Sequence, residues 1–204
     1  MAGTFYNIDF GYALTLDKRN QRYKPTQGYI TTFSQSLPLV LDSSSIMNGL
    51  DISKYHDFSE DLIGALKFHA RTINGIDGDV RLTNRVYIPR SRLRGFNTYK
   101  VGPKDGDDFI GGNYTTAVTA QAELPNLLPE SYRTDFSIHL DTANIWGVDY
   151  SDSIDETNKF RSAIGISANV FTAIGPLSFT LAQSITKAPT DETETFNFRL
   201  GTSF

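Results

Sequence analysis

The chain has 204 residues, of which 39% are hydrophobic and 12% aromatic, and its 19 basic and 23 acidic residues give a net charge of −4. This balance excludes a strongly basic nucleic-acid binder and an acidic tail. The absence of cysteine excludes a disulfide framework, a thiol nucleophile and a thiolate metal site.

The first residues contain no basic segment followed by an apolar core, so we expect no signal peptide in the chain. An uncharged stretch from Ser162 to Thr186 is long enough to span a bilayer as a helix. It is interrupted by hydroxyl and amide side chains and by Gly175-Pro176, so two strands and a turn explain it better.

Apolar and polar residues alternate along the first part of the chain, as in strands with two unlike faces. From Tyr6 to Leu16 the even positions are apolar or aromatic and the odd positions are polar or small. A turn over 18–25 leads to a second strand, Gly28 to Leu37. We predict a polar loop over 41–50 and a third, weakly patterned strand from Ile52 to Phe58.

Alternation returns from Leu62 to Thr72 and is followed by a long polar connection, about 78–110. Connections of this length without periodicity are usually functional or disordered, and we interpret this one as functional. Its basic residues are Arg81, Arg85, Arg90, Arg92, Arg94, Lys100 and Lys104.

Five further alternating segments follow, at about 113–124, 135–141, 161–170, 177–185 and 196–204, which brings the number of predicted strands to nine. All eight prolines lie in turns, loops or strand ends, as expected of a residue that cannot donate to a sheet ladder. Strands of about ten residues with one apolar face indicate a transmembrane β-barrel. A soluble β-sandwich shows the same alternation.

Several short motifs occur in a fixed order, and in them the chain resembles the Omp85 superfamily, in particular its BamA-type outer-membrane protein assembly factors. The first three resemble the sixth extracellular loop and the strand after it. The motifs are Arg94-Gly95-Phe96, Gly102-Pro103, Gly111-Gly112-Asn113, Ala122-Glu123-Leu124-Pro125, Asp141-Thr142-Ala143-Asn144-Ile145-Trp146, Gly175-Pro176-Leu177 and a last strand ending on Phe204.

The resemblance implies an all-β fold, a portion of a transmembrane antiparallel β-barrel whose nine strands correspond to the last nine of sixteen. Residues 1–204 would form the C-terminal part of the barrel domain of a bacterial surface antigen D15 protein in the outer membrane. The chain contains no POTRA domain, and we expect the other strands and the POTRA domains upstream.

Strand parity places Glu123 and Asp141 on the polar, lumen-facing side of adjacent strands. A long loop carrying Arg94 could fold back and reach both carboxylates through charge-assisted hydrogen bonds, or the carboxylates could simply be hydrated. The resemblance implies such a lock, with Arg94, Gly95 and Phe96 as its loop side. His139 stands where the family has an aromatic residue, usually Phe.

The last strand, about 195–204, resembles the β-signal of outer-membrane proteins, with outward Phe196, Phe198 and Leu200 and a terminal Phe204. In the family this strand closes the barrel at a weak lateral seam that can pair with an incoming strand. Gly201 either weakens this seam or relieves crowding.

Other polar and aromatic residues have ordinary interpretations. Trp146, Tyr114 and Phe171 fit an interfacial aromatic girdle. The three histidines lack metal-ligand spacing, and the carboxylates of the acidic loop lack the spacing of a calcium site, so we predict no metal or cofactor. These carboxylates are Asp149, Asp152, Asp155 and Glu156.

The function implied by the resemblance is the folding and insertion of β-barrel proteins into the outer membrane. Partners would be unfolded outer-membrane protein substrates and outer-membrane lipid, with Bam-type lipoproteins and periplasmic chaperones engaged through the missing domains. We predict no enzyme, because no nucleophile–His–carboxylate grouping stands in a credible order. Alternatives are a TamA-like factor, a two-partner secretion pore or a passive pore.

Overall fold

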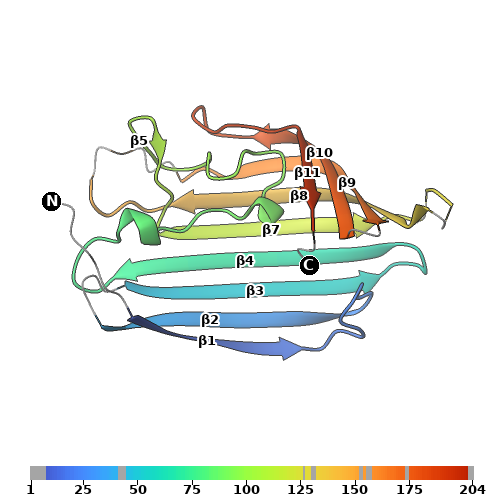
Figure 1. The fold of residues 1–204 in the computed structure, drawn as a ribbon, viewed down its shortest axis with the longest axis horizontal. Coiled ribbons are helices and arrows are strands. Elements are labelled where there is room, and N and C mark those ends of the chain that lie inside the picture. The colour runs from blue at the N-terminus through green and yellow to red at the C-terminus, as the bar shows by residue number, and fades with distance from the viewer. Residues whose placement is uncertain are drawn as a thin grey trace.

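Nine strands form one antiparallel sheet in the order β1-β2-β3-β4-β7-β8-β9-β10-β11 in the computed structural model, which describes residues 8–40, 45–125, 127–129, 132–151, 154, 158–172 and 175–201 (Figure 1). Every strand pairs with its neighbours in chain order, so the predicted all-β meander of nine strands is confirmed. The strands are β1 (Ile8–Asp17), β2 (Gly28–Val40), β3 (Ser45–Asp57), β4 (Ile63–Gly75), β7 (Tyr114–Glu123), β8 (Thr134–Trp146), β9 (Arg161–Thr172), β10 (Gly175–Thr186) and β11 (Phe196–Leu200).

The sheet is strongly curved. Figure 1 shows β1 to β4 and β7 running along the length of the molecule, whereas β11 runs steeply across it, with the long connection between β4 and β7 lying against one face. β1 and β11 stand at the two ends of the strand order. Across the described residues, no helix has both the length and the apolar run needed to cross a bilayer.

The two faces of the sheet differ as the alternation predicts. On the face turned toward the long connection, here called the inner face, side chains of β7 and β8 such as Thr119 and Asp141 are buried. Their neighbours in sequence, such as Val118 and Leu140, lie on the outer face and are 42% and 44% exposed. The outer face is thus mainly apolar.

The predicted polar loop over 41–50 is wrong from Ser45 onward, because β3 begins there and pairs with β4 along its whole length. The alternation is hidden at this point by Asn48, a polar residue on the outer face. Its amide belongs to a row of side chains that crosses four strands at facing positions.

This outer-face row consists of Tyr12, Gln35, Asn48 and Thr72. The Tyr12 hydroxyl donates to Gln35 Oε1 (2.9 Å), Gln35 Nε2 donates to Asn48 Oδ1 (2.7 Å) and Asn48 Nδ2 donates to Thr72 Oγ1 (3.3 Å). Polar groups on an apolar face require such mutual partners. Cross-strand pairing therefore lets the sheet carry a polar row without leaving these amides unsatisfied.

The long connection is more ordered than its polarity suggested. It contains two 3-10 turns, η1 (Leu82–Asn84) and η2 (Arg90–Arg92), and a small hairpin of β5 (Lys104–Asp105) and β6 (Asp108–Phe109). It also buries apolar side chains on the sheet. These are Val80, Val86, Ile88, Leu93, Phe96, Val101 and Ile110.

Candidate functional site

The middle of the long connection is packed onto the inner face by a single apolar cluster. From the connection come Ile88, Leu93, Phe96 and Val101, and from β7, β8 and β9 come Ala117, Ala143, Ile145 and Ala163. The strand residues are mostly alanines, which leave room for the larger side chains of the connection. Burying these side chains provides the non-directional part of the docking energy.

Arg94 supplies the directional part through Asp141 on β8. Its Nε donates to Asp141 Oδ2 and its Nη2 to Asp141 Oδ1, both at 2.8 Å, and its backbone N–H donates to Oδ2 at 3.0 Å. The Asp141 side chain has no exposed surface and that of Arg94 is 12% exposed. A bidentate pair shielded from water is among the strongest polar contacts that a side chain makes.

Two neighbours on β7 complete this arrangement. The Thr119 hydroxyl donates to Asp141 Oδ1 at 2.8 Å, and Arg94 Nη1 donates to Gln121 Oε1 at 3.4 Å. Asp141 faces Thr119 across the strand pair, so the register itself places the hydroxyl. The buried carboxylate thus accepts four hydrogen bonds, so none of its charge is buried without a partner.

Gly95 allows the long connection to turn close against the inner face of β9 and β10. Its φ of +87° lies in the left-handed region, and a Cβ at this position would stand 3.2 Å from the Cβ atoms of both Ala163 and Ala182. The next residue, Phe96, is 2% exposed and forms an antiparallel bridge with Thr193. Glycine therefore serves both the backbone conformation and the close approach.

The structure does not bring Glu123 to Arg94. Glu123 lies on the inner face of β7, two residues beyond Gln121, and among the described residues no hydrogen bond or ion pair joins it to Arg94. The expectation that the guanidinium reaches both carboxylates is corrected: Gln121 occupies the second position. The reason is register, because Asp141 faces Thr119 while Glu123 faces Ser137.

His139 is also inward and only 2% exposed. Its ring lies over Gly165, the residue that it faces on β9, because a Cβ on Gly165 would stand 2.6 Å from His139 Nε2. Neither ring nitrogen has a hydrogen-bond partner in the part of the chain that the structure describes. His139 thus packs beside the lock without bonding to it.

A second polar cluster closes the base of the long connection, and the sequence pattern did not point to it. Buried Arg85 donates to Asp149 and to Asn113 Oδ1 (3.0 Å), while Asn113 Nδ2 donates to Asp149 Oδ2 (2.9 Å). Burial opposes the charge of Asp149, but hydrogen bonds from the Val80 N–H and Asn113, with the charge of Arg85, hold its pKa below the ordinary value.

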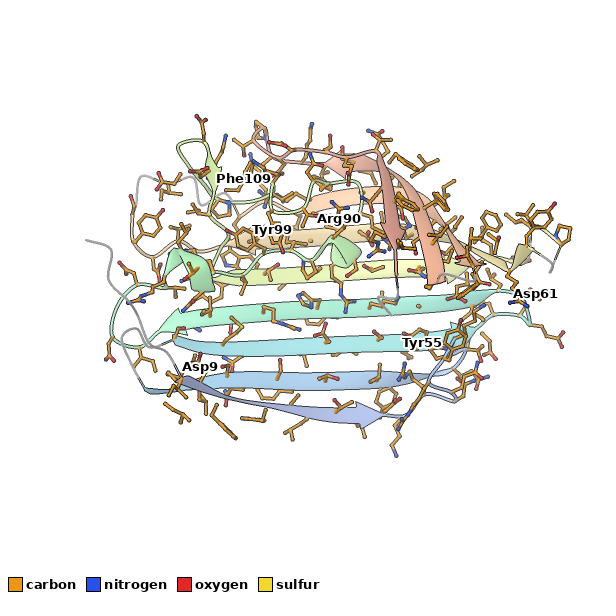
Figure 2. The ribbon with its side chains drawn as sticks, viewed as in Figure 1. Asp9, Tyr55, Asp61, Arg90, Tyr99 and Phe109 are labelled. Atoms are coloured by element: carbon orange, nitrogen blue, oxygen red, sulfur yellow. The ribbon has the colours of Figure 1, made fainter. Side chains whose placement is uncertain are left out.

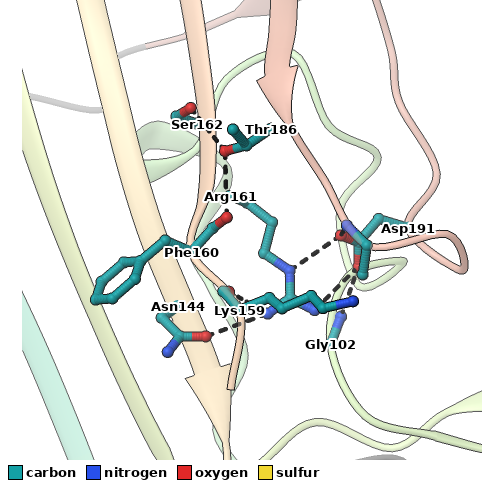
Figure 3. A network of polar contacts seen from close by, with 9 residues as sticks. Gly102, Asn144, Lys159, Phe160, Arg161, Ser162, Thr186 and Asp191 are labelled. Atoms are coloured by element: carbon teal, nitrogen blue, oxygen red, sulfur yellow. Dashed lines mark hydrogen bonds and ion pairs between the residues drawn. The ribbon is translucent and has the colours of Figure 1, made fainter. Parts of the chain in front are cut away.

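A third cluster joins three segments that are far apart in sequence (Figure 3). Arg161, at the start of β9, donates through Nε to Asp191 Oδ2 at 3.0 Å and through Nη1 to Asn144 Oδ1 at 3.2 Å. Asp191 also accepts from the N–H of Gly102 (3.2 Å), within the Gly102-Pro103 motif. The connection between β10 and β11 is thereby fixed to the long connection.

The predicted β-signal residues Phe196, Phe198 and Leu200 are exposed on the outer face of β11. Gly201 directly follows the strand with a φ of +113°, and a Cβ there would meet no described atom within 4 Å. Within the described residues Gly201 therefore relieves no crowding, and its backbone conformation is what favours glycine. Phe204 lies outside the described residues.

The structure places the residues of two further predictions, which themselves stay predictions. Tyr114 and Trp146 face each other at the ends of β7 and β8 with ring centroids 5.8 Å apart, and Lys24 lies 4.9 Å over the ring of Phe171. Of the acidic loop, Asp149 is the carboxylate bound by Arg85, whereas 152, 155 and 156 lie outside the described residues. No group of three metal-ligating side chains gathers within the described ranges.

Residues 1–204 match the family model described as the Omp85 superfamily domain. The outer membrane protein assembly factor BamA of Neorickettsia risticii (strain Illinois) is 24% identical over 209 residues, which cover 100% of this chain and 28% of that protein. BamA of Neisseria meningitidis serogroup B (strain ATCC BAA-335 / MC58) is 27% identical over 139 residues, 55% of this chain and 17% of that protein.

Among solved structures, the crystal structure of BamA from Haemophilus ducreyi lacking POTRA domains 1–3 superposes with a TM-score of 0.83 at 26% sequence identity. The match covers 93% of this chain and 41% of that one. The nine-stranded sheet is accordingly a portion of an antiparallel outer-membrane β-barrel. The chain spans between about a sixth and about two fifths of the proteins that it matches.

Proposed function

The chain belongs to the Omp85 superfamily of bacterial outer-membrane proteins. On that premise we propose that it forms part of the barrel wall of an assembly factor that folds and inserts β-barrel proteins into the outer membrane. The ion pair between Arg94 of the long connection and Asp141 of β8 is the observation that carries the proposal. It keeps the long connection folded against the inner face, where the connection stiffens the strands that support the seam.

The docked connection favours this function over a passive pore. A passive pore requires a hydrated passage, whereas here large apolar side chains of the connection pack onto alanines of β7, β8 and β9. A TamA-like factor or a two-partner secretion pore shares the loop motif and is the nearest alternative. Both curated relatives described above carry the name of an assembly factor, which supports the first reading.

The work of insertion is proposed to occur at the lateral seam. β11 is short, pairing with β10 over only five residues. At a seam that such a strand closes weakly, its backbone N–H and C=O groups can pair with an incoming strand. The client is an unfolded outer-membrane protein, recognised through its own terminal strand by backbone pairing, and no covalent chemistry is involved.

Bam-type lipoproteins and periplasmic chaperones are proposed as partners of the complete protein, outside the barrel wall. Outer-membrane lipid is the partner of the outer face, whose exposed side chains include Ile138, Leu140, Ile164 and Ile166. Contact of this apolar face with acyl chains removes it from water.

The proposal is tested by complementation in cells depleted of their own copy of the protein. Arg94→Ala is expected to lower client assembly, read as the heat-modifiable fraction of an outer-membrane barrel protein, at equal levels of the variant in the membrane. Arg90→Gln is the control, because in the described part of the chain Arg90 bonds to Thr98 and Glu194 and to none of the strands of the sheet. Normal assembly with Arg94→Ala would refute the proposal.

A further inference from the structure

A second carboxylate on the inner face also binds an arginine of the long connection. Arg92, the last residue of η2, donates through Nη2 to Asp51 Oδ1 on β3 at 3.0 Å. We infer that Asp51 is a second anchoring site for the connection, so that Arg92 and Arg94 fasten it to two strands, β3 and β8. The inference concerns loop docking alone and holds whatever the clients of the protein are.

The Asp51 site is built by the sheet itself. His69, which faces Asp51 across β3 and β4, lies with Nδ1 2.8 Å from Oδ1, and Arg71 Nη2 donates to Oδ2 at 2.6 Å. The guanidinium of Arg71 lies over Gly49, where a Cβ would stand 2.9 Å from its Cζ. Glycine at position 49 thus leaves the space that Arg71 needs beside Asp51.

The carboxylate is also held by two side chains of the sheet itself. With His69 on one oxygen and Arg71 on the other, its position is fixed and its remaining lone pairs accept Arg92 without reorganisation. Asp51 is 27% exposed and Arg92 19% exposed, so the pair is partly screened by water. Its contribution is therefore smaller than that of the buried Arg94–Asp141 pair.

The two anchoring carboxylates, Asp51 and Asp141, lie on strands that are not adjacent. β4 and β7 lie between β3 and β8 in the sheet, so the two carboxylates are three strand spacings apart, about 14 Å at about 4.8 Å each. Between the two arginines lies Leu93, which is 3% exposed and belongs to the apolar cluster. Residues 92–94 thus fasten the connection to β3 through Arg92 and to β8 through Arg94, with Leu93 packed between them, and this attachment spans four strands. Figure 2 shows Arg90, in the same turn, over the sheet.

Attachment through two ion pairs changes how the connection leaves the inner face. While one ion pair holds, the arginine of the other stays near its carboxylate at high effective concentration and rebinds. Undocking of this part of the connection therefore requires both ion pairs to break and the apolar cluster to separate. Loss of Arg94 alone should leave it held by Arg92 and the cluster, and loss of both arginines should leave only the cluster and the contacts at Arg85 and Gly102, so that it lifts more often.

The experiment uses the complete protein in outer-membrane vesicles without a client, with Ala117→Cys as the reporter. The chain contains no other cysteine, and Ala117 is 2% exposed beneath Leu93 and Phe96 in the apolar cluster. A maleimide reaches this position only when the connection lifts. Labelling rates are compared for the reporter alone and combined with Arg92→Gln, Arg94→Gln, both substitutions, Arg92→Lys or Arg90→Gln.

Arg92→Gln is expected to raise the labelling rate roughly three- to tenfold, and Arg92→Lys to raise it less because the charge remains. The double variant should label at least that much faster than Arg94→Gln alone, and Arg90→Gln should label like the reporter alone. A rate unchanged by Arg92→Gln in both backgrounds would overturn the second anchor. Because no client is present, that outcome leaves the assembly function to its own test.

Discussion

Arg161 and Asp191 form an ion pair from which water is excluded on both sides: neither side chain has any exposed surface, and Arg161 Nε lies 3.0 Å from Asp191 Oδ2. Asp191 also accepts from the Ala188 N–H at 2.6 Å and the Gly102 N–H at 3.2 Å. One carboxylate thus holds β9, the β10–β11 connection and the long connection together (Figure 3).

Asp191→Ala is therefore expected to destabilise the barrel strongly, by about 3–5 kcal/mol, because it leaves the Arg161 guanidinium buried without its counter-charge. The measurement is the temperature at which the folded form is lost in a heat-modifiability series. Asp107→Ala is the matched control, since Asp107 is fully exposed and pairs with Lys104 only at 3.8 Å. Equal shifts for the two variants would contradict the assignment.

Acidification should loosen the base of the long connection through Asp149. Its pKa is depressed below the ordinary value of 3.8 in the folded state, so its contribution to stability is present above that value. The contribution is lost as the pH falls below about 4 and through the folded-state pKa. The fluorescence of Trp146, assigned by difference from Trp146→Phe, should report this transition.

Asp149→Asn supplies the comparison for this titration. The variant is expected to be less stable than the wild type at pH 7, since Arg85 loses its counter-charge, and to show a flatter acid limb. An unchanged acid limb would mean that another group governs the transition.

Gly95→Ala should weaken docking through two additive effects, the left-handed φ of +87° and the 3.2 Å approach to Ala163 and Ala182. Gly106→Ala separates them, because Gly106 also has a positive φ of +58° but open space around it. We expect the free energy of unfolding to fall by about 1 kcal/mol for Gly106→Ala and by more for Gly95→Ala, as measured by urea unfolding. Equal decreases for the two variants would show that residue 95 does not lie against Ala163 and Ala182.

The polar row on the outer face offers a test of hydrogen bonding in lipid. Gln35→Leu removes the partners of the Tyr12 hydroxyl and of Asn48 Oδ1, while Asn48 Nδ2 keeps Thr72, and should cost about 1–2 kcal/mol. The combination of Tyr12→Phe, Gln35→Leu and Asn48→Leu removes the orphaned groups and should recover most of the loss. Folding into vesicles in urea measures both, and a combined variant worse than Gln35→Leu would contradict the role of the row.

The periodic parts of the fold could be predicted because a sheet between lipid and a polar interior imposes strict alternation. The even positions from Ile8 to Leu16 on β1 share the outer face through the register with β2, as the pattern indicates. Prediction failed at Ser45–Leu50, where an outward asparagine interrupts the alternation. A side chain satisfied by neighbours on other strands leaves no local signal.

The site could be predicted only in part, for a related reason. Arg94 and Asp141 belong to motifs, and strand parity places Asp141 on the inner face, but the exclusion of Glu123 depends on the β7–β8 register, which a single sequence does not specify. Arg85, Asp191 and Asp51 act through contacts between segments 30 or more residues apart or across strands. Nothing in their local sequence distinguishes them from solvated charges.

The most direct test of the account is a double-mutant cycle of Arg94→Gln and Asp141→Asn, with client assembly in depleted cells as the readout. Because the two side chains form one contact, each single variant should lower assembly and the double variant should be little worse than either. Glu123→Gln, on the same wall but not bonded to Arg94, should assemble clients normally. Losses that multiply in the double variant, or a Glu123→Gln defect as large as that of Asp141→Asn, would contradict the account.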